Sequence, residues 1–334
     1  MRFTPSDEQR DFAAVLDTLL DGSDALVAAR AWAAGDTAPG LKLWSRLAEQ
    51  GVSALVVPER AGGLGATPVE LALAFEVLGR HAVPGPWVET AAYLPHALAD
   101  PGPLTDGAVR TVAVPPHTPY ALDADVAEHV FLVSTGSTDG AGAIRAATAG
   151  NPHRSVDGTR RLFEVVSTGS TTETEHPEPG DLGRAFDLAA LATAAQLLGC
   201  GERLLADSVA YVKQRRQFGR EIGSYQAIKH RLADVRIALD FARPLLWGAA
   251  LSAAGSVDRA RDVSAAKVSC ADAAYLASRA ALQVHGAVGY TAELDLSLWI
   301  TKVRALVGAW GTPAFHRARV LDSLVSAGST NEVR

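Results

Sequence analysis

Hydrophobic residues recur at every third or fourth position in the first part of the chain, and this spacing predicts amphipathic helices. The expected helices cover residues 7–20, 41–50 and 68–81. Thr4 or Ser6 is placed to cap the first helix, and Gly51 follows the second as a C-terminal stop. Pro68 begins the third helix, where a missing N–H costs least. We therefore expect an N-terminal helical domain over residues 1–105.

The pattern changes in residues 106–180. Short runs rich in Val and Phe (VRTVAVP, EHVFLVS and RLFEVVS) alternate there with clusters of Gly, Ser, Thr, Asp and Pro. This alternation predicts a reduced antiparallel β module. Its last part, STGSTTETEHPEPGD, has the composition of a solvated connector.

Helical periodicity returns at Leu182 and continues almost to the end of the chain. The expected helices cover residues 184–213, 224–253, 256–285 and 294–326. Each carries Ala and Leu at three- and four-residue spacing, and Gly and Pro are interpreted as marking only the joints. Residues 181–330 are therefore predicted to form a four-helix bundle. The fold class is mainly α with a small β domain.

Composition narrows the possible functions. The 334 residues are 48% hydrophobic and carry a formal net charge of −6, without a long Lys/Arg block, which argues against nucleic-acid binding. No uncharged apolar run is long enough for a membrane span, and the polar N-terminus does not look like a targeting signal. Cys200 and Cys270 have no metal-ligand spacing and are predicted to be buried free thiols. We expect a cytoplasmic protein without a metal site.

Three segments could carry chemistry. The glycine-rich loop at residues 61–66 lacks the G-x-G-x-x-G spacing of a phosphate cradle, so a structural turn is the favoured interpretation. From Arg215 onward, two guanidinium groups, an amide and an aromatic ring stand close together, a set that suits a nucleotide. A capped helix end is the alternative there. Residues 283–298, with His285 between an apolar helix and Gly286, are a weak signal alone.

Taken together, these segments resemble a known family. The string QFG, then Gln226 and His230, then LAD, and later QVHGAVGYT resembles the C-terminal domain of the acyl-CoA dehydrogenases. The N-terminal half agrees, because Trp44 and VVPERAGGLGATPVE look like that family's first helical domain. The resemblance implies an acyl-CoA dehydrogenase-like fold and an FAD-dependent oxidoreductase that converts acyl-CoA thioesters to trans-2-enoyl products. It also implies dimers or tetramers formed through the bundle.

The family holds part of each FAD with a neighbouring subunit, and the resemblance transfers that role to this chain residue by residue. Arg215, Gln217 and Phe218 would contact the pyrophosphate and adenosine of the adjacent subunit's FAD. Gln226 and the backbone at the end of the third bundle helix would complete the pocket. The backbone residues concerned are Gln283, Val284, His285, Gly286 and Ala287.

Departures from the family pattern concern the catalytic base and the flavin ring. Where many members have Tyr-Glu-Gly-Thr, this chain has Ala-Trp-Gly-Thr, with Trp310 at the carboxylate position. The alternative base position falls on Ala189, and the neighbouring family arginine falls on Ala190. The family's flavin-ring loop has no match between residues 108 and 179, and the family glutamine after Thr-Pro falls on Ala314. Neither tryptophan nor alanine can accept a proton from carbon.

These departures lead to a hypothesis about function. We expect a base-lacking flavoprotein subunit that works in a hetero-oligomer with a full-length acyl-CoA dehydrogenase, and we assign this chain no catalytic residue. The alternatives are a self-sufficient homo-oligomeric FAD oxidoreductase with a relocated base, and a non-enzymatic helical-bundle scaffold. Glu293 and Asp295 are the nearest acidic residues after GYT, and we expect them to cap a helix and form salt bridges.

Overall fold

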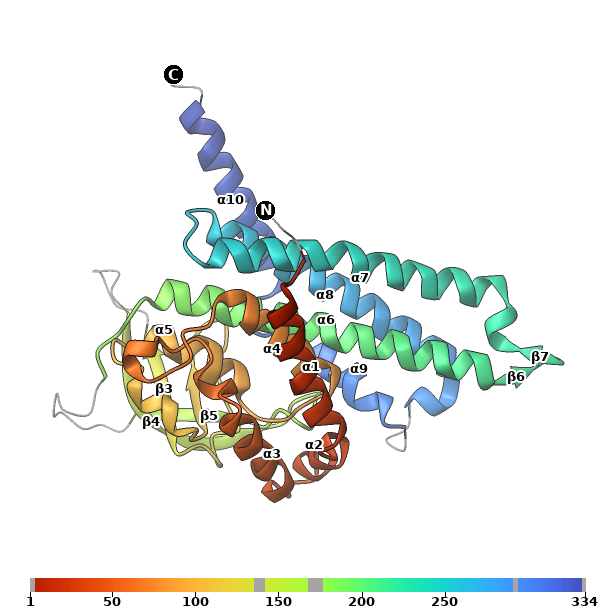
Figure 1. Ribbon diagram of the computed structural model, residues 1–334, viewed down its shortest axis with the longest axis horizontal. Helices are drawn as coiled ribbons and strands as arrows, with labels where there is room; N and C mark the ends of the chain where they lie inside the picture. The colour runs from red at the N-terminus through yellow and green to blue at the C-terminus, as the bar shows by residue number, and fades with distance from the viewer. Residues whose placement is uncertain (1–3, 135–141, 168–176, 291–293, 332–334) are drawn as a thin grey trace.

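The computed structural model describes residues 4–134, 142–167, 177–290 and 294–331. Figure 1 shows the N-terminal helices and a small sheet gathered beside one end of a long helical bundle. The last helix, α10 (Pro313–Asn331), projects away from the rest of the molecule. The chain therefore has the predicted class, mainly α with a small β domain.

The N-terminal part contains more helix than the sequence predicted. Its helices are α1 (Asp7–Asp21), α2 (Ala25–Ala33), α3 (Ala38–Glu49) and α4 (Pro68–Arg80), with short 3-10 turns η1 (Val52–Ala54), η2 (Glu59–Ala61) and η4 (Gly102–Asp106). Ser6 caps α1 in a capping box with Gln9, and Thr67 caps α4 in the same way with Glu70. Helix α2 is not among the predicted helices, because it follows directly on the left-handed Asp24 and has no side-chain cap to signal its start.

A π-helical turn precedes the sheet. The turn η3 (Val88–Tyr93) leads into the short α5 (Leu94–Ala97), and neither was predicted from the sequence. The Leu94 N–H donates to the Glu89 carbonyl five residues earlier, and Pro95 has no N–H with which to form the next regular helical bond. This turn packs against α6 and β1, so its side chains enter the interior.

The β domain is one five-stranded sheet with the order β1-β3-β4-β5-β2. Its strands are β1 (Arg110–Ala113), β2 (Ala121–Leu122), β3 (His129–Ser134), β4 (Ala143–His153) and β5 (Leu162–Ser167). The prediction of a purely antiparallel module was wrong, because β1 and β3 pair in parallel. After β1 the chain crosses to the far edge of the sheet, where β2 pairs with β5. It then returns as β3, which lies beside β1 and runs in the same direction. Strand β4 is not among the predicted strands, and its run is broken by a bulge between Ala149 and Pro152.

The bundle consists of α6 (Leu182–Gln214), α7 (Gln226–Ala253), α8 (Arg259–His285), α9 (Leu296–Gly308) and α10, with the 3-10 turns η6 (Ile222–Ser224) and η7 (Gly286–Tyr290) at its joints. The single helix predicted over residues 294–326 is therefore two helices. The break falls at Trp310 and Gly311, whose φ angles are +53° and +99°. A side chain in the left-handed region cannot continue an α-helix, so the chain turns there.

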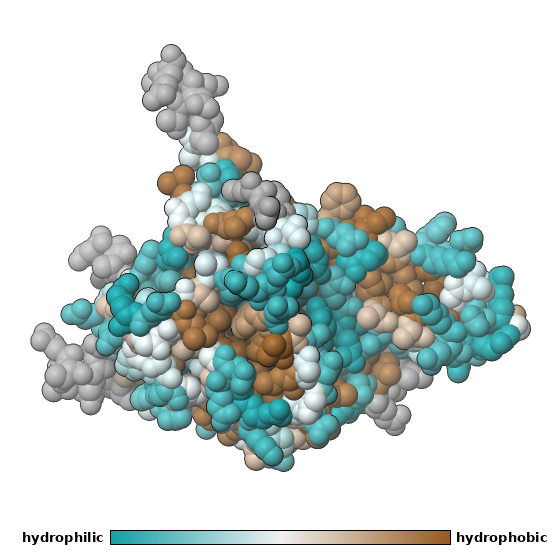
Figure 2. Space-filling view, viewed as in Figure 1, coloured by the Kyte–Doolittle hydropathy of each residue, from teal (hydrophilic) through white to brown (hydrophobic). Residues whose placement is uncertain are grey.

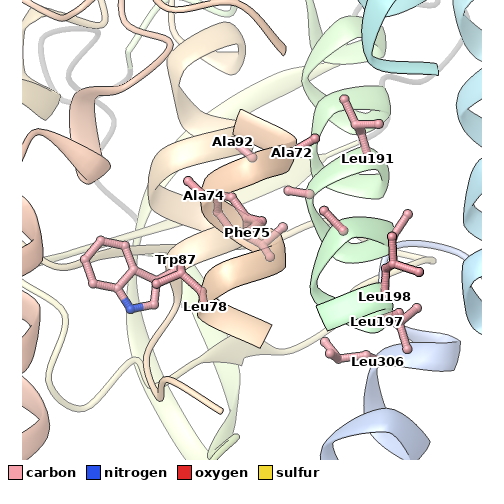
Figure 3. Packing of buried hydrophobic residues seen from close by; sticks show 14 of the residues in the cluster. Ala72, Ala74, Phe75, Leu78, Trp87, Ala92, Leu191, Leu197, Leu198 and Leu306 are labelled. Atoms are coloured by element: carbon pink, nitrogen blue, oxygen red, sulfur yellow. The ribbon is translucent and has the colours of Figure 1, made fainter. Parts of the chain in front are cut away.

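One apolar core joins the N-terminal helices to the bundle. Figure 3 shows α4 side chains such as Phe75 and Leu78 facing Leu191 and Leu198 of α6. The two helices approach so closely that a Cβ on Gly199 would lie 1.9 Å from the Glu76 carbonyl oxygen. Cys200 and Cys270 are buried free thiols, as predicted. None of the helices in the described ranges has the length and apolar content needed to cross a membrane.

Candidate functional site

The residues singled out after α6 form a tight β-hairpin at the end of the bundle farthest from the sheet (Figure 1). The strands β6 (Arg216–Gln217) and β7 (Arg220–Glu221) are joined by Phe218 and Gly219, both with positive φ. Two such residues are what a type I′ hairpin turn requires. Arg215 anchors the base, because its N–H donates to the Tyr211 carbonyl at 2.9 Å and its carbonyl accepts from the Ile222 N–H at 2.9 Å.

This hairpin presents its side chains outward. Phe218 is 91% exposed, and Arg215 and Gln217 are also exposed. Arg215 forms no ion pair with any residue in the described ranges, whereas Arg220 is engaged above the Tyr225 ring at 3.9 Å. Gln226 is exposed at the first position of α7. We call Arg215, Gln217, Phe218 and Gln226 the hairpin surface. An exposed guanidinium three residues from an exposed aromatic ring is suited to binding a ligand or a partner.

The end of α8 lies beside the base of this hairpin. The His285 ring stacks on Tyr211 with 4.2 Å between centroids, and Tyr211 is one turn before Arg215. His285 Nδ1 lies 2.8 Å from the Ala281 carbonyl, and the residue is buried, so its side chain has a packing role. Gly286 has φ +63° and ψ −140°, a conformation that essentially only glycine adopts, and a Cβ there would meet nothing within 4 Å.

The structure thus brings the two predicted segments together at one end of the bundle. Within the second segment, Gln283, Gly286 and Ala287 are exposed, while Val284 and His285 are buried. The backbone of this turn is consequently open to an approaching group, whereas its two buried side chains hold the turn in place.

A second region centres on the break between α9 and α10, residues 309–312, which we call the Trp310 loop. Trp310 is only 1% exposed, and its ring lies 4.9 Å from Tyr93 and 6.2 Å from Phe186 between centroids. Its carbonyl lies 2.9 Å from His316 Nε2, and His316 Nδ1 lies 3.0 Å from Ser264 Oγ. Burial lowers the pKa of His316 to about 4, so the imidazole is neutral and fixes the loop through two hydrogen bonds.

Ala189 and Ala190 lie in the N-terminal third of α6, and both are fully buried. They present methyl groups to the core, so neither contributes a polar atom to a reaction. Ala314 is exposed in the first turn of α10. Most of residues 134–142, considered for the flavin-ring loop, lie outside the described ranges.

Glu89 is the residue that sequence reasoning missed. It lies on the π-helical turn η3 and is fully buried, and neither of its carboxyl oxygens meets hydrogen-bond geometry with any residue in the described part of the chain. Trp310 Nε1 is also buried without meeting hydrogen-bond geometry. Burial raises the pKa of Glu89, and the Arg160 charge and the Trp310 N–H oppose that rise. The available signal was a single acidic residue within the apolar run PWVETAAYL.

The remaining candidates have structural roles. Asp295 pairs with Arg30 at 2.7 Å, as the prediction of salt bridging required, but its side chain does not cap α9. Glu293 lies outside the described residues. In the glycine-rich loop, the N–H groups from Ala61 to Ala66 all donate to nearby backbone carbonyls. That loop is therefore a structural turn, as predicted, and not a phosphate cradle.

Comparisons with known proteins agree with this architecture. Residues 6–100 match the description "Acyl-CoA dehydrogenase, N-terminal domain" and residues 182–325 match "Acyl-CoA dehydrogenase, C-terminal domain". The chain is 32% identical over 308 residues to the acyl-CoA dehydrogenase IpdE2 of Mycobacterium tuberculosis, covering 90% of this chain and 92% of that relative.

Two solved structures illustrate the shared fold. Butyryl-CoA dehydrogenase from Megasphaera elsdenii aligns with a TM-score of 0.83 at 20% identity, over 97% of this chain and 100% of that chain. A chain of the ChsE4-ChsE5 complex from Mycobacterium tuberculosis aligns with the same TM-score and identity, over 97% of this chain and 99% of that one.

Proposed function

The chain belongs to the acyl-CoA dehydrogenase family, and we propose that it is the base-lacking subunit of a hetero-oligomer that oxidises an acyl-CoA thioester with FAD. A full-length dehydrogenase partner would supply the carboxylate that removes the α proton. Bound FAD would accept the hydride from the β carbon. This chain would supply the grip on the adenosine and pyrophosphate of the partner's FAD.

The contrast between the two regions of the site supports this proposal most. The hairpin surface is open, and Arg215 has no ion-pair partner in the described ranges. The Trp310 loop, in contrast, is closed by an indole that is 1% exposed. A chain that keeps the first region open and fills the second is suited to holding a neighbour's dinucleotide and not to deprotonating a thioester itself.

The described residues fit the tail of FAD. Arg215 offers a planar guanidinium that matches a phosphate in two hydrogen bonds. Phe218, 91% exposed, offers a face on which a purine ring could stack. Gly286 leaves the backbone after α8 uncovered, because a Cβ there would meet no atom within 4 Å. These residues would bind and orient the cofactor, and none of them would transfer a proton.

Exposed apolar residues on the bundle support association with another chain. Ile237, Phe241 and Leu245 follow one another at four-residue spacing on α7 and are 53%, 72% and 47% exposed. Leu321 and Leu324 are exposed on α10. Figure 2 shows apolar side chains gathered over the bundle on the face in view. An apolar surface of this kind is typical of a protein interface.

One of the structures with this fold is a complex of two differently named chains, ChsE4 and ChsE5. That assembly gives a precedent for the hetero-oligomer proposed here. The partner of this chain would be a full-length paralogue, and an assembly of identical copies is the alternative that the experiment must exclude.

Co-purification with flavin counting tests the proposal. The chain is expressed alone and together with a full-length acyl-CoA dehydrogenase of the same organism, and FAD is counted per chain after gel filtration. We expect the lone chain to be colourless and the co-purified complex to carry FAD. Arg215→Ala should lower FAD retention in the complex without unfolding the chain, whereas Arg46→Ala on α3, an exposed arginine elsewhere, should not. Unchanged retention in the Arg215→Ala complex would contradict the assignment of the FAD-tail pocket.

Glu89 favours a second candidate, the self-sufficient oxidoreductase with a relocated base. A buried carboxyl with a raised pKa, next to the loop where the family's base would lie, is suited to accepting a proton. Under this alternative the lone chain would bind FAD and turn over an acyl-CoA, and Glu89→Gln would abolish turnover while FAD binding persists. If the chain carries no FAD either alone or in a complex, the scaffold interpretation replaces both.

A further inference from the structure

A cavity of about 430 Å³ lies between the glycine-rich loop before α4, the helix α5 and the first turn of α6. It shares no lining residue with the hairpin surface or the Trp310 loop. Its lining residues are Val56, Pro58, Glu59, Arg60, Gly65, Ala66, Pro68, His96 and Arg184. We call it the Arg184 cavity. Its size is in the range of small-molecule sites.

Arg184 is the main reason to regard this cavity as a binding site. Its Nε is buried and has no hydrogen-bond partner, and its guanidinium forms no ion pair with any residue in the described ranges. The Arg184 backbone is fixed, because its N–H donates to Asp181 Oδ1 at 2.8 Å at the start of α6. A buried guanidinium N–H without an acceptor is costly, so a missing acceptor is the expected explanation.

Other groups around the cavity complete a positively charged wall. Arg60 is exposed at the cavity and, like Arg184, has no ion-pair partner among the residues described. Glu59 is the carboxylate in the lining, and it pairs with neither arginine. Burial and the charges of Arg184 and Arg259 lower the pKa of His96 to about 4, against the opposing effect of Asp181. His96 is therefore neutral at pH 7 and can donate or accept a hydrogen bond.

The backbone contributes little to recognition here. The N–H groups of residues 61–66 are all used within the loop, and Thr67 and Glu70 form the capping box at the start of α4. A ligand would therefore be held by side chains. Besides the two arginines and His96, the wall is lined by apolar residues such as Val56 and Pro68. A ligand with a charged head and a short apolar body matches both kinds of surface.

We propose that the Arg184 cavity binds a small organic oxyanion, a carboxylate or a phosphate monoester, whose charged head pairs with Arg184 and Arg60 while its apolar body packs against Val56 and Pro68. Arginine is the residue best suited to such a head, because its planar fork matches two oxygens of a carboxylate or phosphate. This site goes beyond the proposed function, since it uses neither FAD nor a partner chain.

Isothermal titration on the purified full-length chain tests the proposal. The probes are butyrate, butyl phosphate, inorganic phosphate and butanol, each at constant ionic strength. We expect saturable binding of butyrate or butyl phosphate, weaker binding of inorganic phosphate, and none of butanol. Whichever of the first two binds more tightly identifies the head group. No saturable binding of any oxyanion would overturn the proposal.

Matched variants locate the binding. Arg184→Gln should weaken the favoured probe about tenfold or more, because a charge-assisted hydrogen bond is lost. Arg60→Gln should weaken it as well, and this exposed residue can be replaced without risk to the fold. Arg304→Gln, an exposed arginine on α9, should leave the affinity unchanged. Unchanged affinity in both Arg60→Gln and a folded Arg184→Gln would overturn the proposal, whatever the flavin content of the complex proves to be.

Discussion

Glu89 offers the sharpest test of the physical argument, because its burial should make the wild-type chain less stable than a variant without the carboxyl. Both oxygens are buried and neither meets hydrogen-bond geometry with a residue in the described ranges, so the Arg160 charge and the nearby Trp310 N–H only partly offset the loss of water. Glu89→Met keeps a flexible side chain of similar length and removes both polar atoms. We therefore expect this substitution to raise the free energy of unfolding.

The size of the gain follows from the cost of an unsatisfied polar group, about 1–3 kcal/mol. The gain should also depend on pH. Because burial raises the pKa of Glu89, the folded chain keeps a proton that the unfolded chain releases above its ordinary pKa of 4.5. The contribution of this proton to the free energy of unfolding is fully present below pH 4.5 and is lost as pH rises toward the folded-state pKa of Glu89. The advantage of Glu89→Met should therefore be larger at pH 8 than at pH 5.

Urea unfolding followed by circular dichroism at both pH values measures this difference. Glu76→Met is the matched control, because Glu76 is also a buried carboxylate but its oxygens accept from Arg243 at 2.8 and 2.9 Å. Removing it should destabilise the chain, since the half-buried Arg243 loses one of its two carboxylate partners and keeps only Glu202. Glu89→Met at or below wild-type stability, with the same sign as Glu76→Met, would refute the reasoning. A gain in stability would show that burying this carboxyl costs the fold free energy.

Two further predictions concern the loop and the core. Trp310→Glu should leave the lone chain inactive in a dye-coupled acyl-CoA assay, and measurable turnover would contradict this. The substitution should also lower the melting temperature, because it places a second carboxyl beside Glu89 among Tyr93 and Phe186. Gly199→Ala should destabilise the chain by about 2 kcal/mol or more in urea unfolding, because its Cβ would lie 1.9 Å from the Glu76 carbonyl oxygen; wild-type stability would show that α4 and α6 can separate without cost.

Features encoded by neighbouring residues could be predicted from the sequence. Ser6, one of the two expected cap residues, caps α1, and Pro68 begins α4 as predicted. The parallel pairing of β1 and β3 could not be predicted, because it depends on where the intervening chain crosses the sheet. The break at Trp310 was hidden for a similar reason. Apolar periodicity continues across it, and Trp310 is held in a left-handed conformation by packing against the distant Tyr93 and Phe186 and by the hydrogen bond between its carbonyl and His316.

The candidate site likewise has one part that local sequence predicts and other parts that depend on contacts between distant segments. Arg215, Phe218 and Gly219 stand together in the sequence, and the hairpin that they form is a local structure. The meeting of Glu89 with Trp310 joins segments more than two hundred residues apart and depends on a π-helical turn that no local pattern announced. The Arg184 cavity likewise combines residues from three separate segments.

Turnover by the lone chain tests the central claim most directly. The purified chain is saturated with FAD and assayed with an acyl-CoA thioester and an electron-accepting dye, beside the same assay on its complex with a full-length dehydrogenase. The account predicts turnover by the complex and none by the lone chain. Sustained turnover by the lone chain, lost in Glu89→Gln, would contradict the claim that this chain holds a partner's FAD and leaves proton abstraction to that partner.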